Sequence, residues 1–322
     1  MLRLPRFTYV SPATLDEAIR LRSEHLDSSM YVAGGTDVYP KMKRRQFQPK
    51  QLISLAAVVP SGISNGMGLS IGAGATLTSV SEHQKVRAGY AALSEAAALV
   101  STPQLRNMGT IGGNVCLDTR CNWYDQSLFW RTAEGFCMKT HADVVCRVAP
   151  SSARCLAVAS ADTVPALIAL GAAVRVFGSK GERTVDLADC YREDGIRYLA
   201  LEASEIVTEV ILPPSDGWRS TYLKQRDRGS FDFPIAGVAA AVRWDGKLVA
   251  EARVAITALG SRPVAVDASA LVGTKLDDDA IATAADAAHK AARPMDNTSG
   301  TISQRKRAAR VFTERALRSL RA

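Results

Sequence analysis

The chain has 322 residues, of which 47% are apolar and 22% charged, and it carries a net charge of +8 with a pI near 9.3. That length is typical of two domains rather than one core. We expect no membrane span, because no apolar run reaches bilayer length, and no signal peptide at the amino terminus. Six cysteines are too few for a disulfide scaffold, so we expect a protein of the reducing cytoplasm.

The basic residues are not interleaved with aromatic residues. The two densest clusters are residues 41–45 and the tail from 305 to 321, which has the apolar spacing of a helix. We therefore expect no nucleic-acid partner. A cationic surface that meets acidic partner subunits or an anionic ligand accounts for the charge.

In chain order, the first predicted helix covers residues 11–24, where Thr14 and Glu17 have the spacing of a capping box. A strand at 30–33 then runs into glycines 34 and 35, and a strand at 69–71 runs into glycines 72 and 74. A helix is expected over 88–100, a loop over 103–107 and a further glycine turn over 110–114. Such turns let backbone amides approach a phosphate group, although many of them bind no ligand.

Directly after the last of these turns, 35 residues contain four cysteines, which are Cys121, Cys137, Cys146 and Cys155. In a polar, loop-like segment this density indicates a metal or redox centre more than small buried thiols. Four thiolates suit an iron–sulfur cubane or a structural zinc ion, and the spacing does not distinguish the two. His141 is expected on the surface, and Cys116 and Cys190 are expected to pack as apolar thiols.

In the second half, Asp162 precedes an apolar helix, either as its N-cap or as a carboxylate that reaches a ligand. Strands are predicted at 173–177 and 206–212. The run from Pro213 to Gly217 is the strongest break in the chain, so we divide it into domains at 1–216 and 217–322. The second domain is predicted as an α+β layer of three strands (220–225, 236–244 and 248–258) with helices at 267–271, 277–292 and 304–320.

Together these segments resemble, in order and over nearly the whole chain, the FAD-binding medium subunit of the molybdenum hydroxylases, the xanthine dehydrogenase and carbon monoxide dehydrogenase family. The resemblance is carried by Ala33-Gly34-Gly35-Thr36-Asp37, Gly72-Ala73-Gly74-Ala75-Thr76, Thr110-Ile111-Gly112-Gly113-Asn114, Asp162, Tyr222-Leu223-Lys224 and Phe233-Pro234-Ile235-Ala236-Gly237-Val238-Ala239. It implies a two-part FAD-binding domain of the PCMH or vanillyl-alcohol-oxidase-like type, followed by the C-terminal α+β domain.

The resemblance also implies which residues bind FAD. Asp162 would reach the adenosine side or a ribose hydroxyl, and Lys224 would lie near the isoalloxazine or a phosphate. A solvated charge on a strand edge is the alternative for Lys224. The full implied set is Tyr31, Val32, Ala33, Gly34, Gly35, Thr36, Asp37, Val38, Thr102, Thr110, Gly112, Gly113, Asn114, Asn122, Asp162 and Lys224. No catalytic side chain is expected, because the cofactors supply the chemistry.

Most members of that family have a short loop where this chain carries an insert at about residues 116–156. The insert is similar to the extra loop of the 4-hydroxybenzoyl-CoA reductase branch, which holds a [4Fe-4S] cluster. This resemblance implies that the four cysteines bind such a cluster. It further implies a role in anaerobic degradation of aromatic compounds: electrons enter from ferredoxin and pass to a molybdenum subunit, which removes the phenolic hydroxyl to form benzoyl-CoA.

The family precedent implies a molybdopterin-binding large subunit, a small subunit with two [2Fe-2S] clusters, and a dimer of such heterotrimers. Two alternatives stay open. The chain could serve a paralogous hydroxylase that oxidises another aromatic or N-heterocyclic substrate. It could instead be a non-redox binding protein in which the cysteines hold structural zinc and the glycine turns only connect elements.

Overall fold

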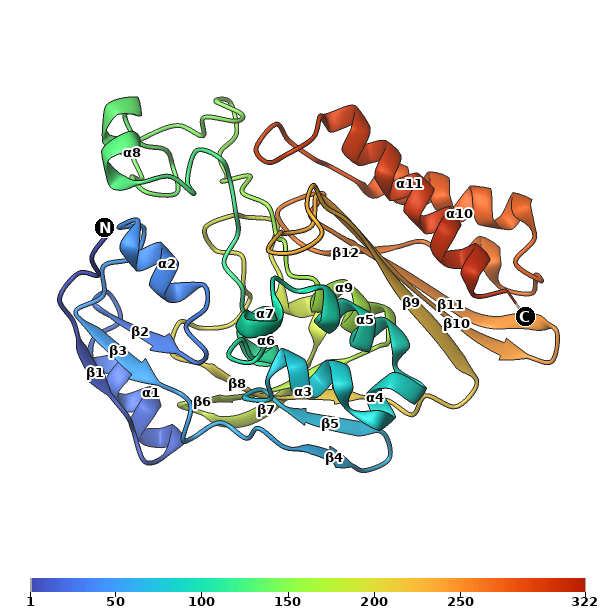
Figure 1. Ribbon diagram of the computed structural model, residues 1–322, viewed down its shortest axis with the longest axis horizontal. Coiled ribbons are helices and arrows are strands. Elements are labelled where there is room, and N and C mark those ends of the chain that lie inside the picture. The colour runs from blue at the N-terminus through green and yellow to red at the C-terminus, as the bar shows by residue number, and fades with distance from the viewer. Residues whose placement is uncertain (1, 322) are drawn as a thin grey trace.

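The computed structural model describes residues 2–321 and contains three sheets that follow one another along the chain (Figure 1). The first is parallel, in the order β1-β3-β2. Its elements are β1 (Thr8–Val10), α1 (Leu15–Glu24), β2 (Ser29–Val32), α2 (Val38–Lys43) and β3 (Gln51–Ser54). Thr14 caps α1 by accepting a hydrogen bond from the Glu17 N–H, as predicted. The Glu17 carboxylate reaches one residue further back than a capping box requires, to the Ala13 N–H.

The second sheet has five antiparallel strands in the order β4-β5-β8-β6-β7. Its strands are β4 (Ile63–Asn65), β5 (Leu69–Gly72), β6 (Ala173–Gly178), β7 (Gly181–Asp186) and β8 (Ile206–Leu212), and a 3-10 turn η1 (Leu187–Cys190) follows β7. Alternate residues of β6 are buried, because one face of the strand packs into the main core with Leu93 and Leu167.

Short helices connect the halves of this sheet: α3 (Leu77–Glu82), α4 (Gln84–Gly89), α5 (Ala91–Leu99), α6 (Pro103–Arg106), α7 (Ile111–Val115) and α9 (Thr163–Ala169). The helix expected over 88–100 is in fact two helices that meet at Tyr90, whose hydroxyl donates to the Pro213 carbonyl. The loop expected over 103–107 forms α6, because Thr102 caps it and Pro103 stands in its first turn.

The C-terminal sheet has four strands rather than the predicted three: β9 (Trp218–Gln225), β10 (Ala236–Asp245), β11 (Leu248–Thr257) and β12 (Val264–Val266). The fourth strand is too short to show a period of two, and a proline precedes it. Helices α10 (Asp278–Ala291) and α11 (Ile302–Ser319) lie along one side of the sheet (Figure 1), and α5 and α9 contact it from the FAD-binding half. The segment 236–242 is therefore buried on both faces. The helix predicted at 267–271 is a single 3-10 turn, η2 (Ser269–Leu271).

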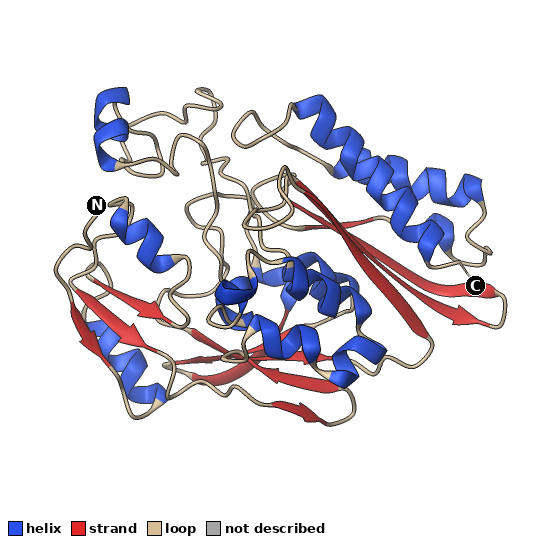
Figure 2. Cartoon of the chain, viewed as in Figure 1, coloured by secondary structure: helices blue, strands red, loops and turns tan. Residues whose placement is uncertain are grey.

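The insert stands apart from the sheets and is mostly loop (Figure 2), with one helix, α8 (Leu128–Glu134). Ser127 caps this helix, and Gly135 ends it in the left-handed conformation at φ 84°. Within residues 2–321, none of the helices has the length and apolar character that a bilayer span requires.

Candidate functional site

The glycine turns are far apart in sequence but meet in the structure. A Cβ added to Gly34 would come within 1.8 Å of the Met108 carbonyl oxygen, so the two backbones are in contact. The backbone N–H of Ile111 donates to the Ala75 carbonyl at 2.9 Å, and Thr76 pairs with Thr110 in an isolated bridge. Turns 33–37, 72–76 and 108–114 therefore form one backbone-rich wall.

Several predicted FAD residues hold this wall together. The hydroxyls of Thr102 and Thr110 cap α6 and α7, accepting hydrogen bonds from Leu105 N–H at 3.3 Å and Gly113 N–H at 3.1 Å. The Asn114 side-chain oxygen accepts from the Thr163 hydroxyl at 2.6 Å, which ties α7 to α9. These three side-chain oxygens therefore act as hydrogen-bond acceptors within the protein.

The other predicted residues of the first turn differ in exposure. Val32 is buried, Ala33 is exposed, and Thr36, Asp37 and Val38 are partly buried. The Tyr31 hydroxyl donates to the Ser204 carbonyl at 2.9 Å. Gly112 packs against Ala73 and Gly113 is exposed, whereas Asn122 is exposed on the insert, outside this wall.

Asp162 and Lys224 form a buried ion pair at 3.0 Å, with side chains 3% and 0% exposed. The Tyr222 hydroxyl donates to the second Asp162 oxygen at 2.8 Å, and the Lys224 ammonium also donates to the carbonyls of Leu99 and Asp232. Burial raises the pKa of Asp162, and Lys224 and Tyr222 oppose that rise. Lys224 is therefore not a solvated edge charge, and the Asp162 carboxylate joins the two domains instead of capping α9.

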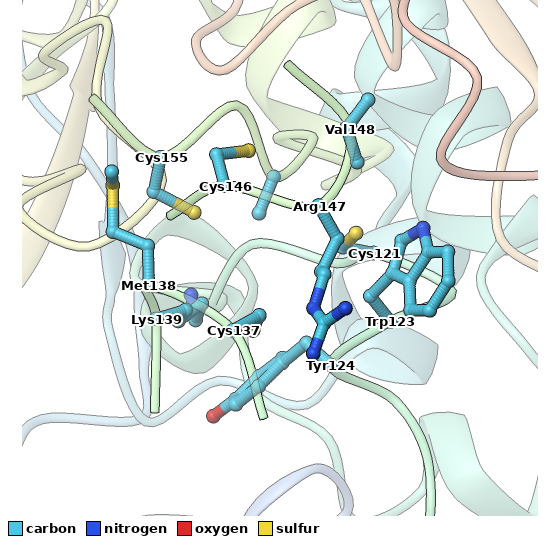
Figure 3. Close-up of a pocket in the computed structure, with 11 residues that line it drawn as sticks. Cys121, Trp123, Tyr124, Cys137, Met138, Lys139, Cys146, Arg147, Val148 and Cys155 are labelled. Atoms are coloured by element: carbon cyan, nitrogen blue, oxygen red, sulfur yellow. The ribbon is translucent and has the colours of Figure 1, made fainter. Parts of the chain in front are cut away.

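The four cysteines of the insert line a single pocket, with about 290 Å³ of space between its walls including the open mouth. Figure 3 shows Cys121, Cys137, Cys146 and Cys155 around this space, with Trp123 and Tyr124 on one side. All four are buried, and all six cysteines of the chain are free thiols. His141 is exposed and stacks on Phe136, as expected of a surface histidine.

The four cysteines offer thiol ligands of the kind that zinc or an iron–sulfur cluster binds. Within the described residues 2–321, however, no three His, Cys, Asp or Glu side chains are gathered as the ligands of a metal, so the predicted [4Fe-4S] site is not shown by the structure. Burial raises the pKa of Cys121 to about 12 and that of Cys155 to about 11. Thiolates at these positions therefore need a compensating cation, which a bound metal centre supplies.

Sequence reasoning missed a buried ionic cluster beside this pocket. Asp118 accepts from Lys139 at 2.6 Å and also binds Lys41, and the two lysine side chains are 7% and 0% exposed. Burial opposes ionisation, but the two lysines hold the pKa of Asp118 below its usual range. Lys41 stands in the basic run 41–45, for which the sequence predicts a cationic surface. The local sequence does not distinguish it from Lys43, which is exposed, or from Arg44 and Arg45, which are partly buried.

A family model for the FAD binding domain in molybdopterin dehydrogenase matches residues 5–215, and one for the CO dehydrogenase flavoprotein C-terminal domain matches residues 221–320. The chain belongs to this flavoprotein family. It is an FAD-binding medium subunit of the molybdenum hydroxylase type, and so part of an oxidoreductase.

The chain is similar in sequence to several relatives over most of its length. The chain is 32% identical to the aldehyde oxidoreductase FAD-binding subunit PaoB of Escherichia coli, over 82% of this chain and 84% of that one. It is 28% identical to the carbon monoxide dehydrogenase medium chain of Hydrogenophaga pseudoflava, over 97% and 96%. A solved structure of carbon monoxide dehydrogenase from that organism superposes with a TM-score of 0.80 at 26% identity, covering 98% of this chain and 97% of that one.

The wall of glycine turns fits the FAD of this family. Ala33 and Gly113 are exposed and small, so a ligand has room to approach the backbone at these positions. At Gly34, the close contact with Met108 leaves no room for a side chain. Backbone amides and hydroxyls on such a wall can bind a pyrophosphate without a basic side chain.

Replacing Gly34 by alanine tests this wall. Because the new methyl group would overlap the Met108 carbonyl oxygen, the two turns must separate, at an expected cost of about 1–3 kcal/mol. We expect the purified complex to lose most of its FAD, measured by absorbance after denaturation. Gly62→Ala is the matched control, since a Cβ added there would meet no atom within 4 Å apart from its own chain neighbours. Full FAD content in Gly34→Ala would show that the cofactor does not need this contact.

Proposed function

We propose that this chain is the FAD- and [4Fe-4S]-containing electron-transfer subunit of a molybdopterin-dependent complex. The observation that carries the proposal is the pocket lined by Cys121, Cys137, Cys146 and Cys155, four residues spread over the insert. When bound, the cluster transfers single electrons and FAD stores two, which lets one chain link one-electron and two-electron partners.

In this proposal, different residues of the chain hold FAD, hold the cluster and join the two domains. The turns at 33–37 and 108–114 hold FAD through backbone groups, and Asp162 and Lys224 fix the C-terminal sheet against that domain. The cysteines hold the cluster. Arg120 of the insert binds Asp37 of the first turn at 3.0 Å, so the loop that holds the cluster is tied to the FAD wall.

The partners follow from the relatives, whose names describe medium chains and FAD-binding subunits. We propose a large subunit with molybdopterin, a small subunit with [2Fe-2S] clusters, and a dimer of such heterotrimers in the cytoplasm. Ferredoxin is the proposed electron carrier. The exposed charges on the insert include Glu134, Asp143 and Arg154, which differ in sign, so docking of ferredoxin would not depend on the insert's charge alone.

Two reactions are proposed for the whole complex. The likeness of the insert to the 4-hydroxybenzoyl-CoA reductase loop supports reductive dehydroxylation to benzoyl-CoA, with electrons that enter from ferredoxin. The second reaction is oxidation of another aromatic or N-heterocyclic substrate, with electrons that leave through FAD. It is supported equally well, by relatives that are named as an aldehyde oxidoreductase subunit and a nicotinate dehydrogenase subunit.

Anaerobic purification of the complex, with flavin, iron and sulfide analysis, tests the cofactor proposal. One FAD per copy of this chain and about four irons beyond those of the small subunit would support it. FAD with no additional iron would leave a medium subunit whose cysteine pocket holds zinc or no metal, and would contradict the proposal.

A pair of assays on the same preparation decides between the reactions. Formation of benzoyl-CoA from 4-hydroxybenzoyl-CoA with reduced ferredoxin would support the reductive role. Reduction of an artificial electron acceptor by aldehydes or by nicotinate, with no dehydroxylation, would support the oxidative role.

A further inference from the structure

A row of alternating charges, partly buried at the first glycine turn and buried at its lysines, runs from that turn to the cysteine pocket. Asp37, at the end of that turn, accepts from Arg120 at 3.0 Å and lies 3.3 Å from the Lys41 ammonium. Lys41 also binds Asp118, whose other oxygen accepts from Lys139 at 2.6 Å. Lysines are rarely buried this deeply unless they are paired, so the burial of Lys41 and Lys139 depends on these carboxylates.

The row carries more positive than negative charge. It contains three cations and two carboxylates, and the neighbouring Arg44 and Asp125, 3.7 Å apart, add one charge of each sign. Arg131 and Arg147, on the same insert, donate to backbone carbonyls of Arg44 and Phe136 rather than to carboxylates. The described protein therefore supplies a surplus of positive charge at this place, which suits an anionic occupant.

Lys139 is the member of the row that reaches the pocket. Its side chain lines the pocket together with the four cysteines. Its ammonium also donates to the Gly195 carbonyl at 2.6 Å, and the Gly195 N–H donates to the Cys155 carbonyl at 2.7 Å. A Cβ on Gly195 would come within 2.8 Å of the Cys155 sulfur, so the segment that Lys139 holds lies directly against one proposed ligand.

We propose that Lys139 is a positioning residue that balances the negative charge of the group held by the four thiolates, and that Asp118 moderates its effect. The inference rests on the proposed function. Four thiolates around an iron–sulfur cubane give a net anion, which becomes more negative on reduction. A buried cation beside it stabilises the reduced state, because charges interact strongly where water is excluded.

The test compares Lys139→Met, Asp118→Asn and the double variant in the anaerobically purified complex, each analysed for iron before a redox titration followed by electron paramagnetic resonance. The cluster signal is the one that a Cys121→Ala complex lacks. Lys139→Met is expected to lower the midpoint potential and Asp118→Asn to raise it by a smaller amount. The double variant is expected to lie between them.

Shifts of the midpoint potential in opposite directions in the two single variants would distinguish an effect of charge from an effect of altered packing. If both single variants lose iron equally, or if both keep the wild-type potential, the role of Lys139 is overturned while the cluster itself stands. If Lys139→Met cannot hold iron, Asp118→Asn, which keeps the cation, must still raise the potential. A wild-type complex without additional iron would overturn the proposed function and, with it, this inference.

Discussion

Replacing Cys121 by alanine is expected to remove the iron of this chain, about four atoms per copy, while FAD content stays at the wild-type level. Cys121 begins a tight turn in which its carbonyl accepts from the N–H groups of Tyr124 and Asp125, so its sulfur is held toward the pocket. With three thiolates left, one corner of a cubane has no protein ligand. Iron, sulfide and flavin analysis of the anaerobic complex measures the effect.

The matched control is Cys190→Ala. Cys190 is as buried as the pocket cysteines but lies in the main core, where its thiol donates to the Asp186 carbonyl. This variant should keep its iron and lose only stability, through the small cavity it creates. Equal iron contents in the two variants would contradict the assignment of the cysteine pocket.

Replacing Lys224 by methionine is expected to destabilise the protein by about 3–5 kcal/mol, because it leaves the Asp162 carboxylate buried without its cation. The double variant Lys224→Met/Asp162→Asn should recover most of this loss, since no buried charge remains. Denaturant unfolding of the purified subunit, followed by circular dichroism, measures the difference. Similar stability of the single and double variants would show that the ion pair is not the source of the effect.

The same variant gives a prediction about pH. Burial already raises the pKa of Asp162, and removing Lys224 takes away the main opposing charge. A carboxyl group whose pKa is higher in the folded than in the unfolded state destabilises folding as pH rises above the unfolded value, near 4. We therefore expect Lys224→Met to be less destabilised at pH 5 than at pH 8, and the double variant to show no such difference.

Much of the architecture could be predicted because short segments of the sequence carry local patterns that specify helix caps, turns and strands. The Thr14 cap, the glycine turns and the strand at 206–212 depend on neighbours within a few residues. The pairing of the two family domains followed from ordered motifs, and the family model matches bear it out. The strand at 264–266 was missed because three residues show no periodicity, and it exists only because β11 offers it a partner.

The candidate site could likewise be predicted only in part. The donor chemistry could be predicted from the residues alone, as four cysteines in one insert and glycines at the turns, because residue type and spacing are local properties. The packing of the chain is what brings the four thiols to one pocket, pairs Lys224 with Asp162, and buries Lys41 and Lys139 against Asp118. These ion pairs join residues that are 21, 62 and 77 positions apart. The burial of their lysines depends on the packing of the whole chain, which no local pattern reports.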